Sequence, residues 1–547
     1  MTPFKLISTA CICLLLNTAT ISQTFTRADS LRGGLRDERT CYDVHYYKLH
    51  LQFNETEQSI TGSNTIHAIK KSSSSFLQVD LFDNMTITSI KDSRNRNLSY
   101  HREHHAVFIE FPSGVDIGQT FYFTIHYSGK PLIAKNPPWD GGFTWSNDKN
   151  GNQWISVSCE GIGASLWWPN KDHLSDKPDS ATILLTVPAN LYAVSNGELR
   201  TIWPGDNYQT YEWHVSYPIN NYNITFYLGD YVHFHEKYQG IEQDYLLQYY
   251  VLSYNLERAK KHFEQVSPML GYYEKYLGPY PFPRDGFALV EAPYLGMEHQ
   301  SAIAYGNDYK PGYDGFDYSM LGLNFDYIII HEAAHEYWGN SVSMEDIADM
   351  WIHEGFCTYS EIIYVESRYG KEIADRYAWS WQYRIMDDEP VIGPYHVNYQ
   401  GSVDMYYKGA TMLHMLRHLV KDDERWWNCL RNIQKDFRFR VTNTNELVAY
   451  INEQLGNDYT WLFNQYLRHK RPPLLEIKFQ NKGKDTHIQT RWTDSSEDFC
   501  MPVFVMDDNG REYAIPTRAG QWTETIVKRS KLSMRNLDTL HYYYRTK

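Results

Sequence analysis

The segment Ile328-Ile329-Ile330-His331-Glu332-Ala333-Ala334-His335 places a His-Glu-x-x-His pattern directly behind three apolar residues. Residues four apart on an α-helix are separated by about 400°, so His331 and His335 share one face, about one turn apart. Two imidazoles arranged in this way can bind one metal ion, and Glu332 can reach a water on that ion as a general base. The isoleucines and alanines favour a buried helix, with Gly339 as its end signal.

A third ligand is needed, because a His-Glu-x-x-His pattern also arises by chance and catalytic zinc sites keep three protein ligands with one open position. Glu354 follows His335 after eighteen intervening residues, in a segment that predicts a helix ending at Gly370. Glu361 lies two turns beyond Glu354 on the same helix face. We expect Glu354 to be the third ligand and Glu361 to orient a ligating histidine. The alternative for Glu361 is a solvent-facing carboxylate.

Hydrophobic periodicity divides the chain into three parts. From about residue 41 to 250, apolar and polar residues alternate in short runs, as in half-buried strands. From about residue 255 to 470 the apolar residues recur at helical spacing, until Pro472-Pro473 ends the helical region. Alternation then returns around the hairpin signal Asn509-Gly510. We predict a multidomain α+β fold with an N-terminal all-β domain (23–250), an α-rich catalytic domain (251–471) and a small C-terminal β domain (472–547).

The N-terminus has the pattern of an export signal. Lys5 precedes an apolar run from about Leu6 to Leu16, followed by small and polar residues. The run is shorter than the roughly 20 apolar residues of a membrane-spanning helix. We predict a signal peptide over residues 1–22 and export to the periplasm or out of the cell. The alternative is an uncleaved anchor that holds the protein on a membrane, facing outside.

Charge and cysteine usage exclude two classes of function. The net charge of −14 argues against a nucleic-acid partner, because phosphate binding needs clustered Lys and Arg. The five cysteines after residue 22 are widely spaced and odd in number, which is typical neither of a disulfide framework nor of a Cys-x-x-Cys metal site. The metal-binding chemistry of the chain therefore depends on its histidines and carboxylates.

Two further motifs agree with the histidine pattern. Leu295-Gly296-Met297-Glu298-His299 lies upstream of it, and Tyr406-Tyr407-Lys408-Gly409 lies downstream. In this order, the motifs resemble those of the gluzincin aminopeptidases of the aminopeptidase N type, whose exopeptidase strand reads Gly-x-Met-Glu-Asn and whose catalytic tyrosine motif reads Tyr-x-Lys-Gly. The resemblance covers roughly residues 40 to 480, and it selects Tyr406 rather than Tyr407.

The resemblance implies a thermolysin-like catalytic domain that holds one Zn²⁺ per chain and cleaves peptides with a free N-terminus. It assigns Glu332 as the general base and Tyr406 as a hydrogen-bond donor to the developing oxyanion. Glu298 is expected to bind the substrate α-ammonium, and Glu160 to assist it; the alternative for Glu160 is an ordinary strand or loop carboxylate. The implied site comprises the metal ligands His331, His335 and Glu354, the catalytic pair Glu332 and Tyr406, the substrate-binding residues Glu298, Glu160, Gly296 and Met297, and Glu361 behind the ligands.

The sequence departs from the family pattern at Leu295, His299 and His353, which puts side-chain preference in doubt. The chain also ends at Lys547, without the large helical C-terminal domain of longer relatives, so we expect a more open site. Two rival functions stay open: a zinc endopeptidase of thermolysin-like type, and a peptide-binding protein with a vestigial metal site. The sequence makes no prediction of oligomeric state.

Overall fold

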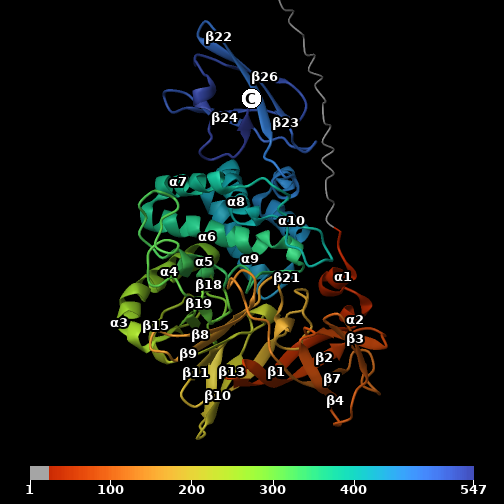
Figure 1. Cartoon of the computed structure of the whole chain (residues 1–547). Coiled ribbons are helices and arrows are strands. Elements are labelled where there is room, and N and C mark those ends of the chain that lie inside the picture. The colour runs from red at the N-terminus through yellow and green to blue at the C-terminus, as the bar shows by residue number, and fades with distance from the viewer. Residues whose placement is uncertain (1–23) are drawn as a thin grey trace, which may run out of the picture.

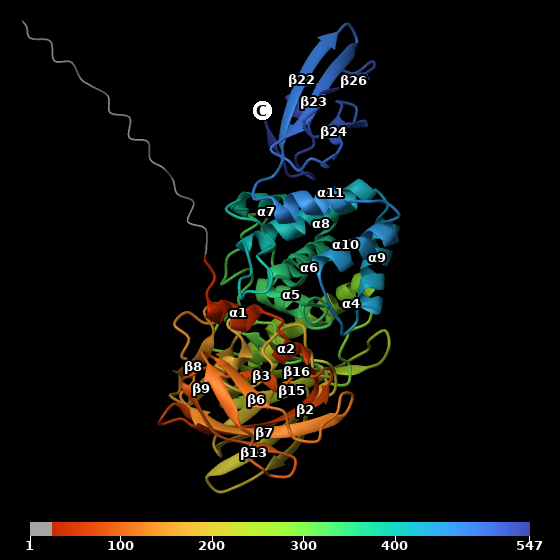
Figure 2. The same cartoon turned by 90° about the vertical axis from the view of Figure 1, so that its right-hand side faces the viewer.

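The computed structural model describes residues 24–547, so the expected signal peptide (1–22) lies outside the described residues. Figure 1 shows the N-terminal strands at one end of the molecule, the helices in the middle and the C-terminal strands at the other end. The view turned by 90° in Figure 2 keeps the same order of layers. The predicted sequence of β, α-rich and β regions is confirmed.

The N-terminal domain is built on a seven-stranded sheet with the order β12-β13-β10-β1-β2-β7-β4. Strand β1 shows why these residues form strands: Leu49, Leu51 and Phe53 are buried while the residues between them are exposed, as one-sided packing requires. The strands of this sheet are β1 (Tyr42–Asn54), β2 (Ser59–Lys70), β4 (Met85–Asp92), β7 (Thr120–Gly129), β10 (Ser180–Pro188), β12 (Glu198–Trp203) and β13 (Tyr208–Val215).

Two smaller sheets and two short helices complete this domain. A four-stranded sheet and a three-stranded sheet share its buried aromatic core, in which Trp167 and Trp168 are fully buried. The elements are α1 (Arg27–Gly33), α2 (Asp37–Thr40), β3 (Phe76–Asp80), β5 (Tyr100–Glu103), β6 (Ala106–Glu110), β8 (Gly142–Asn147), β9 (Gln153–Ser158), β11 (Tyr192–Ser195) and β14 (Phe226–Gly229).

The catalytic domain begins with a mixed five-stranded sheet of order β15-β16-β17-β19-β18. Strand β15 pairs with β16, and β16 pairs with β17. Both strands therefore belong to this sheet and not to the N-terminal domain, where the prediction placed residues up to 250. Alternation showed that they are strands but carries no information on the partner sheet. The strands are β15 (Tyr231–Tyr238), β16 (Tyr245–Leu252), β17 (Phe287–Glu291), β18 (Gly296–Met297) and β19 (Ile303–Tyr305).

The helices of the catalytic domain pack between this sheet and the C-terminal domain (Figure 1). The longest, α6, ends at Gly370 as predicted, where a φ of 92° suits glycine. The other elements are α3 (Leu256–His262), α4 (Val266–Leu277), α5 (Tyr327–Ala334), β20 (Ser343–Met344), α6 (Trp351–Tyr369), α7 (Lys371–Trp381), α8 (Tyr407–Val420), α9 (Asp423–Asp436), β21 (Val441–Thr442), α10 (Thr444–Leu455) and α11 (Thr460–Phe463).

The C-terminal domain is a four-stranded sheet, β26-β23-β22-β27, with a separate hairpin of β24 and β25. The hairpin turns at Gly510, as predicted. The domain contacts the catalytic domain directly: the Tyr543 hydroxyl donates to Asp387, in the loop between α7 and α8, at 3.0 Å. Its strands are β22 (Leu474–Lys482), β23 (Asp485–Thr493), β24 (Val503–Met506), β25 (Glu512–Ile515), β26 (Thr523–Val527) and β27 (Arg545–Thr546). Within residues 24–547, no helix combines the length and apolar character needed to span a membrane, and all five cysteines are free.

Candidate metal centre and active-site cleft

Helix α5 carries both predicted metal-ligand histidines and begins at a buried carboxylate. Asp326 precedes the helix, and its side chain accepts hydrogen bonds from the backbone N–H groups of Ile328 and Ile329, which satisfies free donors of the first turn. Its second carboxylate oxygen accepts the hydroxyl of Tyr305 at 2.8 Å. The start of the helix, and with it the position of His331, is therefore fixed relative to the neighbouring sheet.

The end of α5 differs from the prediction. The helix ends at Ala334 rather than near Gly339, and the backbone continues as wider turns in which the Asn340 N–H donates to the carbonyl of His335. Gly339, with a φ of 110°, lies inside these turns. The turn brings the carbonyl of Trp338 to 3.1 Å from Nδ1 of His335. The earlier helix end therefore serves to fix the His335 ring.

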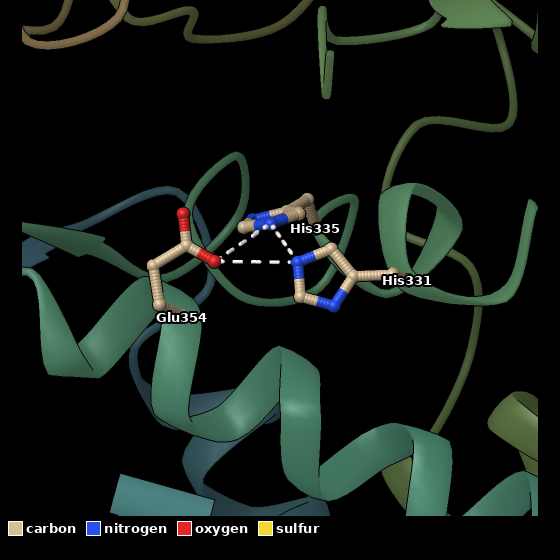
Figure 3. Close-up of side chains that lie close together, drawn as sticks. All are labelled: His331, His335 and Glu354. Atoms are coloured by element: carbon tan, nitrogen blue, oxygen red, sulfur yellow. Dashed lines mark hydrogen bonds and ion pairs between the residues drawn. The ribbon is translucent and has the colours of Figure 1, made fainter. Parts of the chain in front are cut away.

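Three predicted ligand atoms lie close together and face one another, as Figure 3 shows. Nε2 of His331 lies 3.3 Å from Nε2 of His335 and 3.3 Å from Oε2 of Glu354, and Nε2 of His335 lies 3.4 Å from the same oxygen. Donor atoms that bind a tetrahedral ion at about 2.0–2.2 Å lie about 3.3–3.6 Å apart. The triangle therefore has the size that a zinc ion requires.

The hydrogen bonds behind the histidines fix the form of the rings that can bind a metal. A carbonyl can only accept a hydrogen bond, so Nδ1 of His335 carries a proton and donates to the Trp338 carbonyl. Nδ1 of His331 donates to Glu361 at 2.8 Å, and the other oxygen of Glu361 accepts the Tyr377 hydroxyl at 2.8 Å. Both Nε2 atoms then present lone pairs toward Glu354, an arrangement that a cation stabilises.

Glu361 is fully buried behind the ligands. The solvent-facing alternative for this residue is therefore wrong. Its carboxylate is held between His331 and Tyr377 of α7 and is shielded from solvent.

Two imidazoles and one carboxylate with an open side are a donor set that suits Zn²⁺.

Close packing of two helices positions the third ligand. Gly355 of α6 faces Gly409 of α8 so closely that a Cβ on Gly409 would lie 3.0 Å from Cα of Gly355. This approach sets Glu354, on α6, opposite Tyr406 at the start of α8. Helix packing therefore requires glycine at position 409, which the motif alone did not reveal.

Tyr406 and Tyr407 face different surroundings. The Tyr406 ring lies 6.1 Å from the His331 ring, whereas the Tyr407 ring stacks on Trp381 at 4.9 Å. Burial, followed by the negative charge of Glu354, raises the pKa of Tyr406 well above its usual value. The Tyr406 phenol therefore keeps its proton and can only act as a donor toward a neighbouring oxygen.

The edge strand β18 places Gly296, Met297 and Glu298 along the cleft. The Glu298 carboxylate accepts the hydroxyl of Tyr222 at 3.0 Å, and its oxygen lies within 4.8 Å of the ligand atoms of Glu332 and His335. The side chains of Glu332 and Glu298 are therefore brought together at one side of the metal-ligand set.

Glu160 lines the same cleft, close to Glu298. Its Oε1 is buried and has no hydrogen-bond partner among residues 24–547. Burial, followed by the negative charge of Glu298, raises the pKa of Glu160 well above its usual value. A cation bound between the two carboxylates would remove this repulsion.

The cleft has a volume of about 860 Å³ and contains every predicted site residue except Glu361. Its size suits a short peptide. Two residues that depart from the family motifs face away from it: His299 contacts the Tyr227 hydroxyl at 2.7 Å, and His353 accepts the Met344 backbone N–H at 2.9 Å. These departures therefore change the packing around the cleft rather than its lining.

Sequence reasoning missed three residues that support the site. Tyr222 donates to Glu298, the side chain of Asn340 donates to the Glu298 carbonyl at 2.8 Å, and Lys408 is buried with its Nζ on Asp387 at 2.9 Å. Lys408 belongs to a motif that the sequence displayed, so its position was visible although its contact was not. Tyr222 and Asn340 carry no local signal, because their partners lie far away in the chain.

Comparisons with known proteins agree with this geometry. Residues 44–222 match the Peptidase M1 N-terminal domain and residues 261–466 match the Peptidase family M1 domain. Aminopeptidase M1-D of Oryza sativa subsp. japonica is 22% identical over 347 residues, 60% of this chain and 38% of the rice protein. Tricorn protease-interacting factor F2 of Thermoplasma acidophilum is 23% identical over 407 residues, 71% of this chain and 50% of that protein. The matched region thus spans half or less of these two curated relatives.

Two solved structures share the fold. An M1 zinc metallopeptidase from Deinococcus radiodurans has a TM-score of 0.67 at 22% identity, covering 82% of this chain and 97% of that one. Legionella pneumophila aminopeptidase A has a TM-score of 0.73 at 15% identity, covering 90% of this chain and 58% of that one. The fold and the His-Glu-x-x-His helix with its distant glutamate define a chain of the zinc metallopeptidase class. Within that class, the chain belongs to peptidase family M1.

Proposed function

We propose that this protein is a zinc-dependent aminopeptidase that hydrolyses the first peptide bond of peptides with a free N-terminus. The observation that carries the proposal is the position of Glu298, whose carboxylate lies within 4.8 Å of the ligand atoms of Glu332 and His335. A buried carboxylate at this point suits the α-ammonium of a peptide, which would form a charge-assisted pair with it. Glu160 adds a second carboxylate next to the same position.

The short distance between Glu298 and the metal-ligand set favours the first peptide bond. In a peptide, the first carbonyl carbon lies two bonds from the amine nitrogen, about 2.5 Å away, and each further residue adds up to about 3.8 Å. An ammonium held at Glu298 therefore brings the first carbonyl to the ligand triangle and carries later carbonyls past it. An endopeptidase would gain nothing from this carboxylate.

The residues of the chain then divide the chemistry between them. Zn²⁺ held by His331, His335 and Glu354 would polarise the scissile carbonyl and acidify a water. Glu332 would accept the proton of that water and pass it to the leaving amine. Tyr406 would donate a hydrogen bond to the carbonyl oxygen as negative charge develops there, a contribution typically worth ~3–4 kcal/mol.

Two further observations support the proposal from outside the chain. A mutant of the Deinococcus radiodurans M1 zinc metallopeptidase has been crystallised with a Tyr-Ser-Ala substrate, and a two-domain M1 zinc metallopeptidase mutant has been crystallised with L-tryptophan. Both ligands carry a free α-amine, as the proposed anchor requires.

We also propose that residues 1–22 direct export. N-terminal sequencing of the mature protein checks this, and an intact Met1 would contradict cleavage.

One peptide experiment tests the proposed activity. A mixed-sequence peptide, free or N-acetylated, is incubated with the zinc-loaded protein, with and without a chelator, and followed by mass spectrometry. We expect stepwise loss from the free N-terminus that stops on acetylation or chelation, and no cleavage by Glu332→Gln. Internal cuts in both peptides would indicate an endopeptidase. Binding without cleavage, with zinc present, would indicate a peptide-binding protein.

A further inference from the structure

A second cluster of metal-ligating side chains lies away from the active-site cleft, where α7 and α8 face the C-terminal domain (Figure 1). Asp375 comes from α7, and His414 and His418 come from α8. The two histidines are four residues apart, so they share one helix face as His331 and His335 do. The active-site cleft contains none of these residues.

The separations in this cluster match those of the catalytic ligands. Nε2 of His414 lies 3.3 Å from Nε2 of His418, and Oδ1 of Asp375 lies 3.1 Å and 3.3 Å from these two atoms. The three catalytic ligand atoms lie 3.3–3.4 Å apart. Both triangles therefore have the size expected around a tetrahedral ion bound at about 2.0–2.2 Å.

The C-terminal domain contributes a third imidazole, and so a fourth candidate ligand, to the cluster. Nε2 of His541 lies 3.4 Å from Oδ2 of Asp375, and the His541 ring centroid lies 4.1 Å from that of His418. Nδ1 of His541 is 2.8 Å from the carboxylate of Asp538, which leaves Nε2 turned toward Asp375. Glu361 holds His331 in the same way at the catalytic site.

We propose that Asp375, His414 and His418, joined by His541 from the C-terminal domain, form a second zinc site that fastens the C-terminal β domain to the catalytic domain. Imidazoles with one carboxylate select zinc over magnesium or calcium, which take oxygen ligands. His414 is 2% exposed and Asp375 8%, so the ion would be enclosed by protein, as at a structural site.

The charges around the cluster suit a bound cation. Two carboxylates, Asp375 and Asp538, face it, while the neighbouring Arg417 is already paired with Glu366 and Asp423. Nε2 of His414 and Nε2 of His418 both face one oxygen of Asp375, so a cation placed between them would be within reach of all three atoms.

The metal content of the protein decides the question. The purified protein is stripped with a chelator, reloaded with Zn²⁺, separated from free metal and measured by mass spectrometry of the metal. We expect two zinc ions per chain in the wild type, one in His418→Ala and two in the matched control His487→Ala, whose histidine pairs with Glu524 on the C-terminal sheet. One ion in the wild type together with none in His331→Ala would overturn the proposal.

Two arrangements keep this test separate from the catalytic site and from misfolding. His331→Ala removes a catalytic ligand, so one retained zinc in this variant supports the second site whatever the activity. If a variant does not fold, titration of the metal-free wild type with Co²⁺ replaces it. Two equivalents that give ligand-field absorption support the second site, and saturation at one equivalent overturns it.

The docking role has its own readout. Residues 468–471, which lead from the helices to the C-terminal domain, are exposed and open to proteases. We expect proteases to cut His541→Ala there several-fold faster than the zinc-loaded wild type. Wild type from which the second zinc has been removed should be cut at the same rate as His541→Ala. Equal cutting rates for wild type, His541→Ala and His487→Ala would show that no ion fastens the domain.

Discussion

Gly296 of β18 lies so close to Glu332 of α5 that a Cβ at position 296 would be 2.7 Å from the Glu332 carboxylate oxygen. The same Cβ would lie 2.7 Å from Cγ2 of Ile328, one helical turn earlier. The edge strand and the helix therefore approach each other at a position that only glycine allows. This contact fixes the strand that leads into Glu298 relative to the helix that carries His331 and Glu332.

Gly296→Ala should lower kcat/KM for peptides about 100-fold. The new methyl group displaces the Glu332 carboxylate, and a misplacement of about 1 Å in a reacting group can cost about that factor. Gly271→Ala is the matched control, because its Cβ would meet only the Tyr238 hydroxyl at an ordinary 3.6 Å. Steady-state kinetics with a free-N-terminus substrate provide the measurement. Unchanged kinetics in Gly296→Ala, with zinc content intact, would show that Glu332 does not depend on this contact.

Glu298→Gln should reduce kcat/KM for free N-termini by about 100-fold or more, because loss of one partner of a buried ion pair costs about 2–5 kcal/mol. Tyr222→Phe is the matched control: it removes only the hydrogen bond to Glu298, so its effect should be smaller, about tenfold. Steady-state kinetics on the free-N-terminus peptide, with zinc content checked, provide the measurement. Unchanged kcat/KM in Glu298→Gln would contradict the role of Glu298 as the ammonium anchor.

Glu361→Gln should weaken zinc binding by about 10–100-fold, the range found when a carboxylate behind a ligating histidine is removed. The amide can still contact His331 but no longer offers a charged acceptor to Nδ1. Tyr377→Phe leaves the carboxylate in place and removes one of its donors, so its effect should be smaller. Competition with a chromogenic chelator measures the zinc Kd of both variants. Wild-type affinity in Glu361→Gln would mean that the ring orientation of His331 depends on packing alone.

The metal ligands could be predicted from the sequence because helical periodicity places them. His331 and His335 are four apart on one helix, so their relation follows from the geometry of the helix itself. Glu354 was inferred from the need for a third ligand, and Tyr406 was reached only through a motif resemblance. Their positions depend on the close crossing of α6 and α8 at Gly355 and Gly409. No periodicity encodes such a crossing.

Partners far apart in the chain set the limit of sequence reasoning. Tyr222 reaches Glu298 across the interface of the N-terminal and catalytic domains, and His541 reaches Asp375 from the C-terminal domain. The assignment of β15 and β16 failed for a related reason, because alternation identifies a strand but not its partner. Long-range pairing is fixed by the packing of whole domains, which a local pattern does not describe.

The stability of the fold should fall between pH 4 and pH 6 through Asp285. This carboxyl is 2% exposed, and burial raises its pKa from 3.8 to about 6, although it accepts the Ser216 backbone N–H at 3.0 Å. Between these pH values the folded state keeps a proton that the unfolded chain has released. The free energy of unfolding therefore decreases as pH rises through this window, by ~3 kcal/mol at most.

Asp285→Asn removes this titration while keeping an oxygen that can accept from Ser216. Relative to wild type, the variant should therefore gain stability as pH rises from 4 to 7, whatever its constant offset at low pH. Arg284 and Glu198 also lie near the carboxyl and are present in both proteins, so the comparison isolates the contribution of position 285. Thermal unfolding of the two proteins across the window measures the difference in Tm. A constant difference would mean that the folded state accommodates the ionised carboxylate as readily as water does, through its backbone hydrogen bond and Arg284.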